Sequence, residues 1–231
     1  MMKYFLLLIA LICSSVNCLA EETQIALDHA PIQVNDIASI KRGAKFFATT
    51  CMACHTLIYM RYNSLAEEAG VTYDRMPINV KNWPLNVTPP DLSLEADVRG
   101  VDWIYTYLHS FYADPSRPTG VNNLLVPNTA MPGIVAALQG QQVFATDMRA
   151  SRRYFGGHLQ WYDELILQSQ GALSPQQFDA SMTDVVNFLY YSAEPYRAEQ
   201  NRLGYWVIGF LLILWAMMYY LKKNYWKDIE K

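Results

Sequence analysis

The residues best suited to chemistry lie together at Cys51-Met52-Ala53-Cys54-His55, a C-x-x-C-H pattern. At the end of a helix, positions three apart share one face, so two thiols can reach the two vinyl groups on one edge of a porphyrin. The adjacent imidazole then reaches the iron. The pattern predicts one haem c, attached covalently through Cys51 and Cys54, with His55 as an iron ligand.

Two other chemistries use cysteines at this spacing. A redox C-x-x-C of the thioredoxin type sits in a βαβ unit, and the sequence shows no such pattern. A zinc site needs two further cysteine or histidine ligands at suitable spacing, and there is no second C-x-x-C. The two remaining cysteines, Cys13 and Cys18, fall in an N-terminal export signal. Haem attachment is therefore the favoured interpretation.

A haem iron has a second axial position, and several side chains compete for it. Met131-Pro132 follows a Pro-, Gly- and Asn-rich stretch with enough chain to cross the distal face of the ring. Its rivals are Met76-Pro77, which is tethered only 21 positions after His55, and the histidines His29, His109 and His158. A thioether opposite an imidazole favours ferrous iron and raises the potential. On spacing alone, Met131 leads and the alternatives stay open.

The elements that must position these groups are mostly helical. Apolar residues at helical spacing predict an amphipathic helix from Ile37 into the cysteine motif. Residues 73–90 hold four prolines and predict extended loop, and 102–112 reads as a short aromatic helix. Ser174-Pro175-Gln176-Gln177 is a capping box that starts a long helix ending at Glu194-Pro195. The stretch 140–171 gives no clear pattern.

The two ends of the chain carry export and membrane signals. Residues 1–20 run from a positive charge through an apolar stretch to small residues, as in a secretory signal peptide. Residues 203–221 contain no charge and are long enough to span a bilayer. Four lysines lie in the tail, 222–231, and place it in the cytoplasm. The remaining domain, 21–202, is then periplasmic and anchored by a single pass in a bacterial inner membrane.

The charge of this exported domain limits its partners. It holds 13 basic and 19 acidic residues, a net charge of −6. Such a surface repels nucleic acid and favours a basic soluble partner. We expect no nucleic-acid binding.

From about Ile40 to its end, the sequence resembles the cytochrome c1 family, the haem subunit of the ubiquinol–cytochrome c oxidoreductase (cytochrome bc1) complex, in its bacterial form. C-x-x-C-H alone is shared by many proteins, but an ordered series of further motifs carries the resemblance. These are Lys41-Arg42-Gly43, Tyr59-Met60-Arg61-Tyr62, Pro89-Pro90-Asp91-Leu92-Ser93, Asp102-Trp103-Ile104-Tyr105, Asn128-Thr129-Ala130-Met131-Pro132, and Asp184 to Leu189 with Ala193-Glu194-Pro195.

The resemblance implies a mainly α, class I cytochrome c-like haem domain with long loops and one C-terminal transmembrane helix. It implies Met131 as sixth ligand and Arg99 as partner of a haem propionate. It also implies that Pro90, Trp103 and Tyr105 line the haem pocket. Plain core packing is the alternative for these residues, and for Tyr105 it is an equally good explanation. The mitochondrial members' insertions and extra cysteines are missing here, and residues 139–171 match weakly.

The function implied is a one-electron relay in a respiratory chain. The partners are cytochrome b beside the anchor, the Rieske iron–sulfur protein as donor and a cytochrome c as acceptor. The chain makes and breaks no bond itself, since quinol oxidation belongs to the complex. Three alternatives stay open: a stand-alone tethered shuttle to a terminal oxidase or peroxidase, a haem catalyst or gas sensor with an open iron site, and a purely structural subunit.

Overall fold

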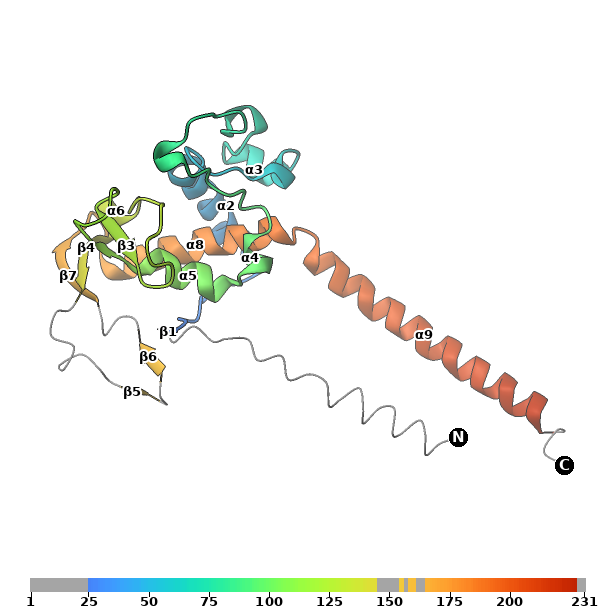
Figure 1. The fold of residues 1–231 in the computed structure, drawn as a ribbon. Helices are drawn as coiled ribbons and strands as arrows, with labels where there is room; N and C mark the ends of the chain where they lie inside the picture. The colour runs from blue at the N-terminus through green and yellow to red at the C-terminus, as the bar shows by residue number, and fades with distance from the viewer. Residues whose placement is uncertain (1–24, 145–153, 156–157, 161–164, 228–231) are drawn as a thin grey trace.

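In the computed structural model, which describes residues 25–144, 154–155, 158–160 and 165–227, a helical globule is followed by one long helix that projects away from it (Figure 1). The signal-peptide prediction for 1–20 lies outside these residues. The described α-helices are α2 (Ile37–Phe46), α3 (Ser64–Glu68), α4 (Glu95–Val98), α5 (Val101–His109), α6 (Ala136–Gln139), α8 (Pro175–Ala193) and α9 (Arg197–Trp226). The strands are β1 (Ile25–Ala26), β2 (Phe111–Ala113), β3 (Val121–Asn123), β4 (Gly140–Phe144), β5 (Tyr154–Phe155), β6 (His158–Gln160) and β7 (Leu165–Gln170).

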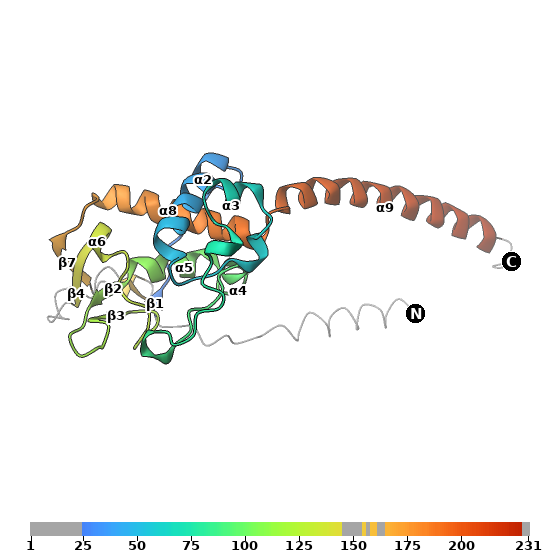
Figure 2. The ribbon, with the colours of Figure 1, turned by 90° about the horizontal axis from the view of Figure 1, so that it is seen from above.

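Helices α2 and α8 cross at the centre of the globule (Figure 2). A Cβ on Gly43 of α2 would lie 1.9 Å from the carbonyl oxygen of Asp184 and 2.8 Å from the Cβ of Phe188, both on α8. Only glycine permits so close an approach of two backbones. The rings of Phe47 and Phe188 pack with their centroids 5.9 Å apart beside the crossing, and both are fully buried.

Polar contacts fix the same crossing from its edges. The guanidinium of Arg42 donates from Nε and Nη2 to the two carboxylate oxygens of Asp184, at 2.7 and 2.8 Å. The buried amide of Asn187 donates to Ser39 Oγ and to the carbonyl of Gln33, both at 3.0 Å. The sequence block from Asp184 to Leu189 is therefore the part of α8 that meets α2.

The helix predicted to run into the cysteine motif is confirmed, with one local difference. Asp36 caps α2 by accepting the N–H of Ser39 at 3.0 Å, and the helix continues as a π-helical turn, Phe47–Cys51. Single π-turns are uncommon and occur often at functional sites. The turn brings Cys51 to the end of the helix, and the backbone N–H groups of Cys54 and His55 both bond to its carbonyl.

The capping box at Ser174 and Gln177 is confirmed at the start of α8. The aromatic helix predicted over 102–112 is α5, but it ends at His109, and Phe111–Ala113 form strand β2 instead. The stretch 73–90 is loop with two short 3₁₀ turns, Tyr73–Arg75 and Pro84–Asn86. The stretch with no clear pattern begins and ends in an antiparallel pair, β4 with β7. The other pairs are β2 with β3, antiparallel, β1 with β6, parallel, and β5 with β6, antiparallel.

Helix α9 contains the predicted anchor, 203–221, and extends beyond it at both ends. Its 30 residues reach about 45 Å at 1.5 Å per residue, longer than the hydrocarbon layer of a bilayer. The side chains along it are largely exposed, among them Trp206, Phe210 and Trp215. Within the described residues, this is the one helix long and apolar enough to cross a membrane.

Candidate haem site

His55 is held by a single polar contact to the P-P-D-L-S stretch. Its Nδ1 lies 2.8 Å from the carbonyl oxygen of Pro90. A carbonyl only accepts hydrogen bonds, so Nδ1 carries the proton and the lone pair of the neutral ring is on Nε2. This is the tautomer of a metal-ligating histidine, and its partner fixes the direction of the ring.

The environment of His55 also keeps the ring neutral. Burial lowers its pKa, and the hydrogen bond to Pro90 and the charges of Glu95 and Asp91 only partly offset that effect. A neutral imidazole is required for coordination, because a protonated ring has no free lone pair. Pro90 therefore holds His55 through its backbone carbonyl, and the sequence did not reveal this contact.

Asp91 fastens the segment after the cysteine motif to the same stretch. Its carboxylate accepts hydrogen bonds from Thr56 Oγ1 at 2.6 Å, from the N–H of Ile58 at 2.9 Å and from the N–H of Ser93 at 2.9 Å. Burial raises the pKa of Asp91, but the hydrogen bonds from Ser93, Thr56 and Ile58 outweigh burial and leave the pKa below its ordinary value. The backbone N–H of Leu92 donates to the carbonyl of Thr56 at 2.9 Å.

The two cysteines are partly exposed, and their thiols are not joined in a disulfide. Burial, with a smaller contribution from the neighbouring Cys54, raises the pKa of Cys51 to about 12. A thiol this hard to ionise does not act as the attacking thiolate of a disulfide oxidoreductase. The raised pKa therefore does not favour thiolate redox chemistry at Cys51.

A second group of side chains runs from the turn before α5, along one face of that helix, to the first residue of β2. Arg99, Trp103, Tyr107 and Phe111 stand four residues apart, and we call them the α5 row. The Arg99 guanidinium carbon lies 4.3 Å from the centroid of the Trp103 ring, and the rings of Trp103 and Tyr107 stack at 5.0 Å. The ring of Phe111 meets that of Tyr107 edge-on at 5.1 Å.

Met131 joins the end of this row. The hydroxyl of Tyr107 donates to Met131 Sδ at 3.5 Å. Burial raises the pKa of Tyr107, so this hydroxyl keeps its proton. The rival methionines are core residues: Met52, Met60, Met76 and Met182 are all buried in the main hydrophobic cluster. Met148 lies outside the described residues.

The two groups adjoin at Glu95. Its carboxylate accepts a hydrogen bond from Arg99 Nε at 2.6 Å and raises the pKa of His55. Glu95 thus interacts with both groups, through a hydrogen bond with Arg99 and through its charge with His55. Arg99 uses one of its five N–H groups on Glu95, and its two Nη atoms make no hydrogen bond within the described part of the chain.

Tyr105 lies on the opposite face of α5 from the row. Its ring packs 4.2 Å from that of His109, and His109 contacts Phe178 of α8. Burial, together with the charge of Asp179, raises the pKa of Tyr105 to about 12. These contacts are those of a residue packed between two helices, and they do not bring Tyr105 to Met131.

The histidines that the sequence offered as alternative ligands have other surroundings. His109 is buried, with Nδ1 2.7 Å from the carbonyl of Tyr105 and Nε2 3.2 Å from Asp179. His29 lies beside the carboxylate of Asp102 at 3.3 Å and is exposed. His158 falls in β6. Both ring nitrogens of His109 therefore have partners within the fold.

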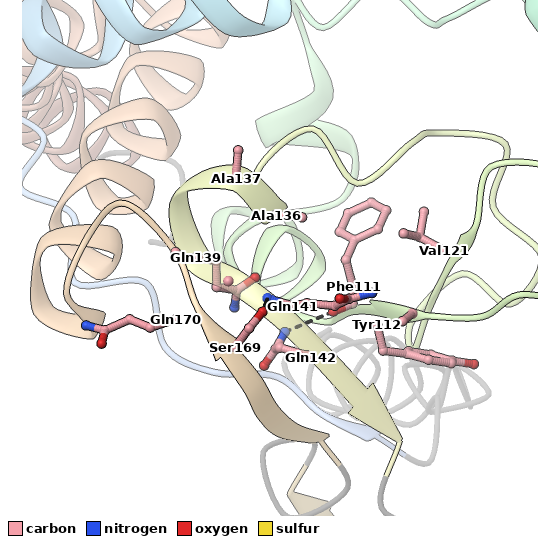
Figure 3. A pocket seen from close by; sticks show the side chains of 13 residues that line it. Phe111, Tyr112, Val121, Ala136, Ala137, Gln139, Gln141, Gln142, Ser169 and Gln170 are labelled. Atoms are coloured by element: carbon pink, nitrogen blue, oxygen red, sulfur yellow. Dashed lines mark hydrogen bonds between the residues drawn. The ribbon is translucent and has the colours of Figure 1, made fainter.

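A pocket of about 340 Å³ lies elsewhere, between α6, β2 and the β4–β7 pair (Figure 3). Its polar groups serve the fold: Gln142 Nε2 donates to the carbonyls of His109 and Phe111, at 2.7 and 2.9 Å. None of the predicted haem residues lines it. The pocket therefore does not belong to the site.

These features define a class I cytochrome c-like haem domain with one apolar C-terminal helix. The cytochrome c1 family matches residues 28–86 and 78–229, and the chain belongs to that family. Membership implies a haem cofactor and an electron-carrying role. The chemistry of the donor set fits that group: two thiols, an imidazole with its lone pair on Nε2, and a thioether outside the core.

Individual relatives cover most of the chain. It is 39% identical over 224 residues to cytochrome c1 of Allochromatium vinosum, covering 88% of this chain and 90% of that protein. It is 34% identical over 249 residues to a Nitrosomonas europaea protein named ammonia monooxygenase gamma subunit, covering 100% and 99%. The cytochrome b/c1 of Bradyrhizobium diazoefficiens is 25% identical over 239 residues, covering 84% of this chain and 34% of that longer protein.

Proposed function

We propose that this chain is the one-electron carrier subunit of a respiratory cytochrome bc1 complex. It accepts an electron from the Rieske iron–sulfur protein and passes it to a cytochrome c. Membership in the cytochrome c1 family supports this proposal. The single observation that supports it at the level of residues is the contact of His55 with Pro90, because His55 directly follows two cysteines at C-x-x-C spacing.

In this proposal Cys51 and Cys54 hold one haem c through thioether bonds, and the bound haem supplies a ferric/ferrous couple. His55 offers Nε2 as one axial ligand, because Nδ1 is committed to Pro90. Met131 offers its thioether as the other. The Pro90 carbonyl makes the imidazole more basic by accepting its proton in a hydrogen bond. If His55 and Met131 both bound the haem iron, outer-sphere electron transfer would be favoured over activation of an external ligand.

The α5 row supports the propionate end of the site. Arg99 keeps two Nη groups for an anion after pairing with Glu95, and its guanidinium carbon lies 4.3 Å from the centroid of the Trp103 ring. A planar fork in a fixed orientation suits a carboxylate. We assign Arg99 to a haem propionate and Trp103 and Pro90 to the wall of the pocket.

We place the haem domain in the periplasm and the lysine-rich tail in the cytoplasm, with 203–221 as the membrane span. The exposed apolar surface of α9 supports a lipid or protein neighbour around it. The longer Bradyrhizobium relative, named cytochrome b/c1, supports cytochrome b as that neighbour.

The test is purification from membranes in mild detergent, followed by mass spectrometry of the mature chain and reduced-minus-oxidised spectra. We expect one porphyrin mass on the peptide that contains Cys51 and Cys54, and b-type haem in the same complex. Replacing both cysteines by alanine should abolish the haem-stained band. Free thiols in the mature native chain would overturn the haem assignment.

The same preparation separates the alternatives. A haem-bearing chain that purifies without b-type haem or an iron–sulfur partner is a stand-alone shuttle, and the complex assignment then fails. If Met131→Leu leaves the optical spectrum and midpoint potential unchanged, the sulfur ligand is wrong and an open-site haem protein is favoured. Copurification with a monooxygenase in place of a quinol oxidase would favour the role that the Nitrosomonas relative's name describes.

A further inference from the structure

Met131 and Tyr107 belong to a closed ring of hydrogen bonds that no other described methionine has. Tyr107 Oη lies 3.5 Å from Met131 Sδ and 2.9 Å from Thr129 Oγ1. The backbone N–H of Met131 donates to the same Thr129 Oγ1 at 3.3 Å. The segment 129–131 is thus linked to Tyr107 through the side chain of Met131 directly and through its backbone N–H by way of Thr129.

The number of donors and acceptors fixes which atom donates in each hydrogen bond of this ring. A thioether sulfur only accepts, so the single phenol proton of Tyr107 points to Met131 Sδ. The phenol oxygen is then free to accept, and Thr129 donates its hydroxyl proton to it. The oxygen of Thr129 in turn accepts the N–H of Met131. Every donor is used once, and hydrogen bonds in such a chain polarise one another.

The ring is built on a rigid base. Tyr107 is clamped between Trp103 and Phe111, and its carbonyl accepts a hydrogen bond from Asn123 Nδ2 at 2.9 Å. Asn123 is almost fully buried, and its side-chain oxygen accepts the N–H groups of Leu125 and Val126 at 2.9 and 3.2 Å. The loop that carries Met131 is therefore attached to α5 by buried hydrogen bonds.

We propose that Tyr107 is a positioning residue for the Met131 ligand: its hydroxyl occupies one of the two lone pairs of the sulfur and aims the other at the iron. This inference rests on the proposed haem function. A thioether ligand favours ferrous over ferric iron, so an orientation that keeps the sulfur bound favours the ferrous state. Tyr107 therefore raises the midpoint potential and holds the sulfur against displacement.

The test uses the full chain with haem attached, purified in detergent, and Tyr107→Phe, which keeps the ring stack and removes only the hydroxyl. A net hydrogen bond of about 0.5–1.5 kcal/mol corresponds to a factor of about 2–10. We expect imidazole to displace the sulfur from ferric haem at a concentration about 2–10-fold lower. We expect the midpoint potential to fall by about 20–60 mV, at 59 mV per tenfold for one electron.

Four companion variants make the result specific. Thr129→Val removes the hydroxyl that links the ring and should shift both readouts in the same direction, whereas Thr129→Ser keeps the hydroxyl and should restore wild-type values. The double variant Tyr107→Phe with Thr129→Val should shift them by less than the sum, because both single changes break one ring. Tyr196→Phe, at an exposed tyrosine, controls for loss of a phenol as such.

The outcomes separate this inference from the function beneath it. If Met131→Leu abolishes the charge-transfer band of thioether-ligated ferric haem while Tyr107→Phe matches wild type in imidazole affinity and potential, the positioning role is wrong and the ligand assignment stands. If Met131→Leu alters neither the band nor the potential, the ligand assignment itself fails. A Tyr107→Phe chain with unchanged haem content but weaker sulfur ligation supports the inference.

Discussion

The contact of Gly43 with α8 gives a sharp test of the fold. In Gly43→Ala, the new Cβ would lie 1.9 Å from the Asp184 carbonyl oxygen, whereas ordinary contacts begin near 3.4 Å. The two contacted atoms are the backbone oxygen of Asp184 and the Cβ of Phe188, so neither can rotate away. Helices α2 and α8 must separate by about 1–1.5 Å, and a gap of that size forfeits a quarter to a half or more of each packing contact across it.

The expected cost follows from two opposing effects. Overpacking a core costs about 1–3 kcal/mol, occasionally more, and the Phe47–Phe188 contact lies beside this crossing. Alanine regains about 1 kcal/mol of helix propensity relative to glycine. Because the clash is with helix backbone, we take the upper end of the overpacking cost, about 3 kcal/mol. The net loss is then about 2 kcal/mol, which in a domain of this size lowers Tm by about 4–8 °C.

The assay is guanidinium and thermal unfolding in detergent, followed by circular dichroism at a wavelength that reports helix. The matched control is Gly204→Ala in α9, where no atom lies within 4 Å of the added Cβ. That control should leave the haem domain's transition unchanged. A Gly43→Ala chain as stable as wild type, or more stable through propensity alone, would refute the close crossing.

Two further changes test contacts of the same domain. Arg42→Ala leaves the largely buried Asp184 carboxylate without its bidentate partner, and we expect the free energy of unfolding to fall by about 0.5–1.5 kcal/mol. Arg42→Lys should lie between the two, and the differences should be smaller at high salt. Equal stability of all three chains would show that this ion pair does not stabilise the fold. Asp91→Asn tests a pH dependence: the folded pKa of Asp91 lies below its ordinary value of 3.8, so its stabilisation is present above that pH and is lost as pH falls through the folded pKa. The difference in free energy of unfolding between wild type and Asp91→Asn should be full at neutral pH and should shrink as the pH falls below about 4. A difference that does not depend on pH would contradict the stabilising role assigned to the Asp91 carboxylate.

Local signals in the sequence predicted the parts of the fold that depend on local interactions. The capping box at Ser174 and the apolar face of α8 each follow from residues within one or two turns, and both are confirmed. The proline-rich stretch 73–90 is loop as expected. The cysteine pattern indicated the chemistry because its spacing alone sets where two thiols and one imidazole lie.

Contacts between distant residues were beyond that reasoning. Pro90 meets His55 across 35 positions through a backbone carbonyl, and every residue has a carbonyl, so no residue type announces this contact. Tyr107 was missed although a signal existed, because it continues the four-residue spacing of Arg99 and Trp103. The pairing of β4 with β7 brings together strands separated by a stretch of weak pattern, which the sequence could not align.

The two halves of the candidate site share one platform, and that platform is α8. Phe188 meets α2, the hydroxyl of Ser192 donates to the carbonyl of Ser93 at 3.0 Å, and Asp179 meets His109 of α5. The histidine half is therefore attached at the C-terminal end of α8 and the methionine half at its N-terminal end. Because His55 and Met131, the two proposed ligands, are both tied to α8 through these contacts, a change in the packing of α8 should shift the proposed sulfur ligation even where it touches neither residue.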